Sequence, residues 1–144
     1  MYDRILVPTD GSDHSDLAID HAMDLAEQFD AIVHVLFVVD QAGPSGHWDV
    51  AVEKQEATGE EVLDAVVALG NERSVDVERH LRRGMPSEEI VDAATDYEAD
   101  LIVMGTQGRT GFSRIATAGS TTERVVRLTE IPTLVVGGAG AGDT

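Results

Sequence analysis

The sequence contains no cysteine, which excludes disulfides, thiolate nucleophiles and cysteine-ligated zinc or iron–sulfur sites. Aromatic residues make up only 4% of the 144 residues, and no apolar run approaches the roughly 20 residues that a membrane-spanning helix needs. The start of the chain lacks a basic segment followed by an apolar stretch and a small-residue cleavage site. We therefore expect a cytoplasmic protein with no membrane partner, stabilised by packing alone.

Basic residues are also scarce. The chain has 27 acidic and 10 basic residues, a formal net charge of −17, and Lys54 is its only lysine. This balance argues against a nucleic-acid partner, because nucleic-acid binding needs basic surface. It favours adaptation to a very salty cytosol, since at molar salt the Debye length falls to about 3 Å and repulsion between acids is screened. The alternative is an ordinary acidic protein.

Apolar runs alternate with segments of helical periodicity, which is typical of repeated βα units and an α/β fold with a parallel sheet. The expected strands are residues 4–8, 31–39, 75–81, 101–104 and 133–136. The expected helices are residues 12–28, residues 50–73, one that begins at Pro86 and one that begins near Ser120. Residues 1–138 form one domain in this prediction, and the glycine-rich residues 139–144 are expected to be a disordered tail.

Local signals support this assignment. Ser12 offers a side-chain oxygen to cap the first helix, and Pro86 followed by two glutamates suits another helix N-terminus. The continuous apolar run 31–39 predicts an interior strand covered on both faces. Within residues 75–81, the apolar Val75, Val77 and Leu81 alternate with charged residues, which predicts an edge strand. Residues 40–49 are expected to form a loop.

A glycine-rich segment follows the fourth expected strand, framed by Gly105, Gly108 and Gly119. Glycine lets backbone amides approach an anion closely, and the next helix adds unpaired N–H groups at its positive end. Ser120 and Glu123 have the spacing of a capping box, which places the helix start independently of any ligand. The segment therefore predicts a phosphate cradle.

Charge placement points to the same segment, because residues 105–127 carry a local charge of +3. The charged residues are Arg109, Arg114, Glu123, Arg124 and Arg127. A polyanion would be repelled from most of the surface and attracted here. The alternative is an ordinary loop whose arginines pair with surrounding acids.

Asp10 follows the first expected strand. Ligands of open α/β sheets bind beyond the carboxyl ends of the strands. A carboxylate there accepts hydrogen bonds from a ribose diol or an adenine amino group. The alternative is that Asp10 only shapes a turn.

Three stretches of the sequence resemble the universal stress protein family, in its ATP-binding type. They are residues 2–12 (YDRILVPTDGS), residues 99–108 (ADLIVMGTQG), and residues 119–126 with 131–136 (GSTTERVV and IPTLVV). The resemblance implies an open five-stranded parallel sheet in the order 3-2-1-4-5 with helices on both faces, of the Rossmann-like, adenine nucleotide alpha hydrolase-like type. It also implies a homodimer formed through the last strand, and a protein partner that the sequence does not identify.

ATP-binding members of that family share the pattern G-x2-G-x9-G followed by Ser or Thr. The resemblance implies ATP, with or without Mg²⁺, as the ligand, and it implies two groups of site residues. The phosphate group is Gly105, Gln107, Gly108, Arg109, Gly119, Ser120, Thr121 and Thr122, and the ribose and adenine group is Pro8, Thr9, Asp10, Val38 and Met104. The chain departs from the pattern at residues 109–118, which are ten residues where the family has nine.

Other signals are weak. The five histidines have no metal-ligand spacing, so the sequence predicts no metal site. G-x-S-x-G, P-loop and G-x-G-x-x-G motifs are missing, so no catalytic residue is assigned and any ATP hydrolysis is expected to be slow. The main hypothesis is an ATP-binding stress-response or signalling protein. The alternatives are a dimeric stress-related interaction protein without nucleotide, and an enzyme acting on another nucleotide or a flavin.

Overall fold

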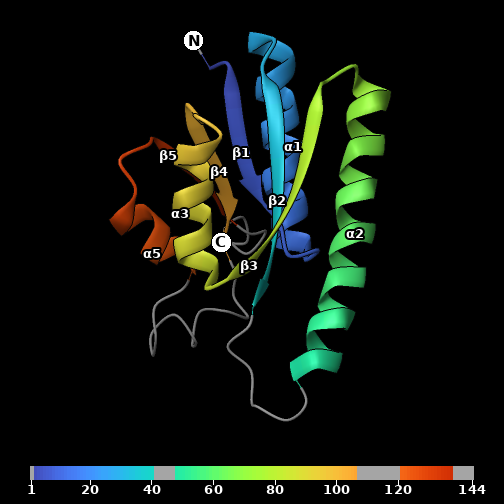
Figure 1. Ribbon diagram of the computed structural model, residues 1–144. Helices are drawn as coiled ribbons and strands as arrows, with labels where there is room; N and C mark the ends of the chain where they lie inside the picture. The colour runs from blue at the N-terminus through green and yellow to red at the C-terminus, as the bar shows by residue number, and fades with distance from the viewer. Residues whose placement is uncertain (1, 41–47, 107–120, 138–144) are drawn as a thin grey trace, which may run out of the picture.

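The computed structural model describes residues 2–40, 48–106 and 121–137, with side chains described from residue 53 in the second range. The strands are β1 (Arg4–Pro8), β2 (Ile32–Asp40), β3 (Val77–Gly84), β4 (Leu101–Gly105) and β5 (Thr133–Val136). The helices are α1 (Asp13–Phe29), α2 (Trp48–Arg73), α3 (Pro86–Asp96) and α5 (Thr121–Leu128). All strand pairings are parallel, in the order β3-β2-β1-β4-β5, which confirms the predicted fold class (Figure 1).

The sheet is the middle layer of three. Helices α1 and α2 cover one face, and α3 and α5 cover the other (Figure 1). Successive residues of β1 point to opposite faces of the sheet. Ile5 packs against the layer of α1 and α2, and Leu6 packs against the layer of α3 and α5; both side chains are fully buried. This explains the continuous apolar runs of the central strands. Within the described ranges, no helix combines the length and apolarity needed to cross a bilayer.

The predicted helix signals are confirmed where the structure describes them. Ser12 caps α1, and its Oγ accepts a hydrogen bond from the Ser15 N–H at 3.3 Å. The helix ends at Phe29, and the next residue, Asp30, has a left-handed backbone with φ of 58°. Pro86 occupies the first turn of α3. The predicted helix start at Ser120 and the tail 139–144 lie outside the described residues.

Two predicted boundaries are wrong. Strand β3 begins at Val77 rather than at residue 75, because the Val75 N–H donates to the Gly70 carbonyl at 2.8 Å and closes the carboxyl end of α2, which leaves residue 75 in the connection between α2 and β3. Val75 is buried in this connection, and its apolar side chain led the sequence pattern to predict a strand there. The strand then continues to Gly84 along β2. The predicted loop 40–49 is shorter than expected, because β2 includes Asp40 and α2 begins at Trp48.

Candidate functional site

A cavity of about 450 Å³ lies at the carboxyl ends of the central strands, between β1, β2 and β4 and the first turns of α1, α3 and α5. It occupies the point where the sheet order reverses between β1 and β4, the usual ligand position in open α/β sheets. Eight of the thirteen predicted site residues line it. They are Pro8, Thr9, Asp10, Val38, Met104, Gly105, Thr121 and Thr122.

The remaining predicted residues lie outside the described part of the chain. They are Gln107, Gly108, Arg109, Gly119 and Ser120. The cavity also has lining residues that the sequence reasoning missed, namely Ser12, His14, Ser15, Leu36, Pro86, Ile90 and Thr106. Leu36 could have been found, because it lies two residues before Val38 in β2 and side chains of a strand alternate between its faces.

The turn between β1 and α1 is held by its own hydrogen bonds. The Asp10 N–H donates to Ser15 Oγ at 3.1 Å, and Ser15 Oγ donates in return to Asp10 Oδ1 at 2.6 Å. Oδ1 also accepts the Ser12 N–H at 2.9 Å. Gly11 supplies the positive φ of 82° that the turn requires. Asp10 therefore shapes the turn, as the alternative interpretation expected, and this wall of the cavity is rigid before any ligand arrives.

The Asp10 carboxylate keeps an oxygen for a ligand. No described residue donates a hydrogen bond to Oδ2, since both internal bonds go to Oδ1. Burial raises the pKa of Asp10, but the hydrogen bonds from Ser12 and Ser15 outweigh it and hold the pKa below its ordinary value. The group is therefore an anionic acceptor near neutral pH, suited to hydroxyl or amino donors.

The end of β4 forms the opposite wall, and Gly105 is essential to it. A Cβ at Gly105 would lie 2.2 Å from the backbone carbonyl oxygen of His14, so only glycine allows the start of α1 to approach β4 this closely. The Gly105 carbonyl accepts a hydrogen bond from Thr122 Oγ1 at 3.0 Å. This bond ties the first turn of α5 to the end of β4 and fixes where the helix N-terminus points.

The cavity wall has an apolar and a polar part. Buried Leu36, Ile90 and Met104 line one part, together with partly buried Val38. The polar part is formed by hydroxyl, carboxylate and imidazole side chains, those of Thr9, Asp10, Ser12, His14, Ser15, Thr106, Thr121 and Thr122. Such a division fits a ligand with a flat apolar group at one end and hydrogen-bonding or anionic groups at the other. The first turn of α5 adds N–H donors and a partial positive charge.

The structure describes only some of the arginines that give residues 105–127 their predicted excess of positive charge. Arg127 pairs with Glu123 at 3.0 Å, whereas the Arg124 guanidinium lies 3.7 Å from the Met85 sulfur and has no acidic partner among the described residues. Among the described residues, Arg124 is therefore a positive charge on α5 without an acidic partner. Arg109 and Arg114 lie outside the described residues.

The matching family model, a relative and two solved structures that this chain resembles all belong to one family. The Universal stress protein family description matches residues 1–137. Universal stress protein MJ0531 of Methanocaldococcus jannaschii is 40% identical over 141 residues, covering 94% of this chain and 82% of that protein. A crystal structure from the universal stress protein family of Burkholderia pseudomallei has a TM-score of 0.80 and 30% identity, with 94% and 96% of the two chains covered. A universal stress protein solved in complex with cAMP has a TM-score of 0.72 and 25% identity, with 94% and 97% covered.

Proposed function

Because the chain belongs to the universal stress protein family, we propose that it binds an adenine nucleotide, with ATP as the first candidate, in the cavity at the carboxyl ends of β1 and β4. The observation that carries the proposal is the divided cavity wall, apolar on one part and lined by hydroxyls, a free carboxylate oxygen and a helix N-terminus on the other. The relative solved with cAMP supports an adenine nucleotide as the ligand class.

The wall suggests an orientation for the ligand. The adenine ring packs against Val38, Ile90 and Met104, and the ribose hydroxyls donate to Asp10 Oδ2. The phosphates extend toward the first turn of α5, where the dipole and unpaired N–H groups favour anions. In this proposal Gly108, Gly119 and Ser120 complete the phosphate cradle together with Gln107 and Arg109, and Mg²⁺ accompanies the phosphates.

The proposed role is binding and signalling rather than turnover. A carboxylate whose pKa lies below its ordinary value is a poor general base at neutral pH, so Asp10 suits ligand positioning better than activation of a water. We propose that nucleotide occupancy, in the cytoplasm, changes the surface that a protein partner meets, with ATP hydrolysis slow if it occurs.

Asp10→Asn tests the binding mode. The asparagine retains an oxygen that accepts from Ser12 and Ser15, but it replaces the free carboxylate oxygen by an amide donor. We expect ATP to raise the melting temperature of the unmodified protein, and the variant to bind ATP about tenfold more weakly because a charge-assisted hydrogen bond is lost. Thermal unfolding over a range of ATP concentrations in high salt measures both.

The matched control is Asp92→Asn, which removes the same charge from an exposed position on α3 outside the cavity. It should bind ATP like the unmodified protein. Denaturing the purified protein and assaying the supernatant for adenine nucleotide gives an independent measure. A protein that carries no nucleotide and shows no response to added ATP would exclude the proposal and favour the interaction protein without nucleotide.

We further propose that two chains associate through β5. This strand is an edge of the described sheet, so no described strand pairs with one side of its backbone, and Leu134 and Val135 are 39% and 40% exposed. Val126 and Leu128 of α5 are exposed as well, at 49% and 59%. Exposed apolar side chains on an edge strand are typical of an association surface.

Leu134→Lys should convert the dimer to a monomer, because it places a charge in the proposed apolar interface. Leu17→Lys is the control, since Leu17 is similarly exposed (37%) but lies on α1. Sedimentation equilibrium in high salt distinguishes the two. A monomeric unmodified protein, or a dimer that survives Leu134→Lys, contradicts this interface.

A further inference from the structure

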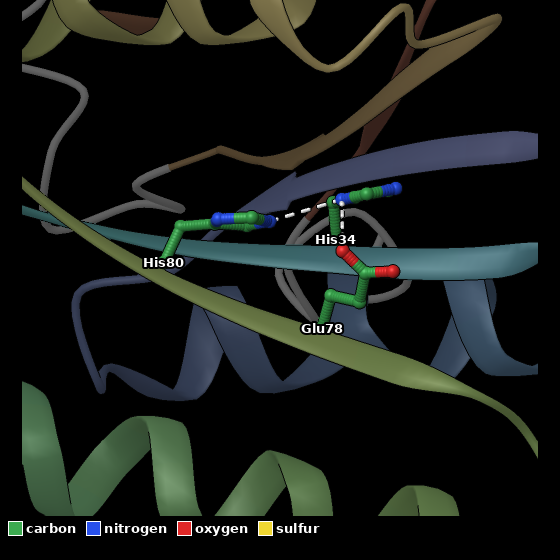
Figure 2. A group of neighbouring side chains, drawn as sticks. All are labelled: His34, Glu78 and His80. Carbon is green, nitrogen blue, oxygen red and sulfur yellow. Dashed lines mark hydrogen bonds and ion pairs between the residues drawn. The ribbon is translucent and has the colours of Figure 1, made fainter.

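Two histidines and a glutamate meet on the face of the sheet that α3 covers, away from the nucleotide cavity. His34 lies on β2, and Glu78 and His80 lie on β3, brought together by the register that pairs His34 with Glu78 (Figure 2). His34 Nδ1 is 3.0 Å from His80 Nε2 and 3.8 Å from Glu78 Oε1, and Figure 2 shows both contacts converging on this nitrogen. All three ligand atoms lie within 4.8 Å of one another.

We propose that His34, Glu78 and His80 form a binding site for a divalent transition-metal ion, with Zn²⁺ as the first candidate. Two imidazole nitrogens and one carboxylate oxygen are a common ligand set for such ions. With metal–ligand bonds of about 2.0 Å and tetrahedral angles, ligand atoms lie roughly 3.3 Å apart. The two distances from His34 Nδ1, 3.0 and 3.8 Å, lie on either side of this value.

The unbound cluster leaves a buried group unsatisfied. His34 is only 6% exposed, and its Nε2 has no hydrogen-bond partner among the described residues. Its Nδ1 shares a single proton with His80 Nε2, since one of two facing neutral imidazoles donates and the other accepts. A metal ion takes the lone pairs of His34 Nδ1 and His80 Nε2, and the shared proton moves to the other nitrogen of the ring that carried it, so both imidazoles stay neutral. The metal bonds at Nδ1 then offset part of the cost of burying this ring, whose Nε2 still has no partner among the described residues.

The surroundings hold the ligands in place. The Tyr97 ring stacks on the His80 ring with a centroid distance of 3.9 Å, which restricts the orientation of that imidazole. The nearby Arg82 guanidinium forms ion pairs with Glu89 at 2.9 Å and Asp96 at 3.1 Å, and it donates a hydrogen bond to the Tyr97 hydroxyl. Its positive charge is therefore largely compensated before a cation binds.

An ion has a route to the cluster and the carboxylate has room to close on it. The Glu78 side chain is 57% exposed and belongs to an edge strand, so it can approach the ion by side-chain rotation alone. The bound ion would join the edge strand β3 to β2. His34 and Glu78 are 44 residues apart in the sequence, so the spacing of possible ligands along the chain gave no sign of this site.

The test uses the full chain, treated with a chelator and kept in high potassium chloride to suppress weak binding to the many surface carboxylates. We expect Zn²⁺ to raise the melting temperature, with binding saturating at one equivalent, and Mg²⁺ at the same concentration to have no such effect. His80→Ala and Glu78→Gln should each weaken Zn²⁺ binding by tenfold or more, on the order of the loss seen when a metal site is perturbed. Titration calorimetry with zinc chloride measures the affinity. The positions are chosen because they are on the edge strand, where the variants are expected to fold.

His21→Ala is the matched control, because His21 is an exposed histidine on α1. It should bind Zn²⁺ like the unmodified protein. Co²⁺ gives a second readout, since tetrahedral coordination produces intense visible absorption that His80→Ala should lose. The proposal is overturned if the unmodified protein shows no saturable Zn²⁺ binding, or if His80→Ala and Glu78→Gln bind as tightly as His21→Ala; the stacked rings would then serve packing only.

Discussion

Gly105→Ala is expected to lower the free energy of unfolding by about 3 kcal/mol and the melting temperature by roughly 10 °C. The added methyl group would lie 2.2 Å from the carbonyl oxygen and 2.7 Å from the carbonyl carbon of His14. Both atoms belong to the backbone at the start of α1, so no side-chain rotation relieves the overlap. Either the end of β4 or the first turn of α1 must move, and both line the cavity. Nucleotide-dependent stabilisation should be lost as well.

Gly137→Ala and Gly59→Ala separate this effect from the general cost of replacing glycine. A Cβ at Gly137 meets no atom of the described residues within 4 Å, so this variant should unfold like the unmodified protein. A Cβ at Gly59 would contact the Phe37 ring at 2.6 Å, a side chain that has some room to shift, so an intermediate loss is expected. Chemical denaturation compares all three. If Gly105→Ala unfolded like Gly137→Ala, α1 and β4 could not approach as closely as described.

The layers of the fold could be predicted from the sequence because burial leaves a clear pattern there. A strand covered on both faces is apolar along its buried part, as in residues 5–7 of β1 and 101–104 of β4, and the one-sided apolar face of α1 identified it as a surface helix. The boundaries of β3 could not be predicted in the same way. The strand carries four arginine or histidine residues, and the apolar alternation of Val77 and Leu81 continues back to Val75, which lies in the connection after α2.

The candidate site was predictable as far as it depends on strand ends. Asp10 lies just after β1 and Gly105 is the last residue of β4, and these strands are neighbours, so their position in one cavity follows from the strand order that the resemblance implied. The internal role of Ser15 was not predictable, since its bond to Asp10 depends on the geometry of one turn. The meeting of His34 with His80 depends on the register of β2 against β3, which the sequence does not specify.

The stability of the protein is expected to rise steeply with salt. Between about 0.1 M and about 2 M potassium chloride, the melting temperature should climb by roughly 10 °C or more, because screening removes repulsion within a chain of net charge −17. The described ion pairs show how few cations are available. Arg73 alone contacts Asp20, Asp24 and Glu27 along α1, and its hydrogen bond to Glu27 holds the pKa of that carboxyl below its ordinary value.

If salt stabilises the protein by screening repulsion between acids, a variant with fewer unpaired acids should depend less on salt. The triple variant Glu61→Gln, Glu72→Gln, Asp92→Asn neutralises three exposed carboxylates for which no described ion pair exists, so it removes repulsion without breaking a salt bridge. It should be more stable than the unmodified protein in dilute buffer and should respond less to potassium chloride. Sucrose at equal osmolality should not reproduce the effect of the salt. A flat salt response of the unmodified protein would contradict halophilic adaptation, because it would mean that repulsion among the unpaired acids contributes little to the free energy of unfolding.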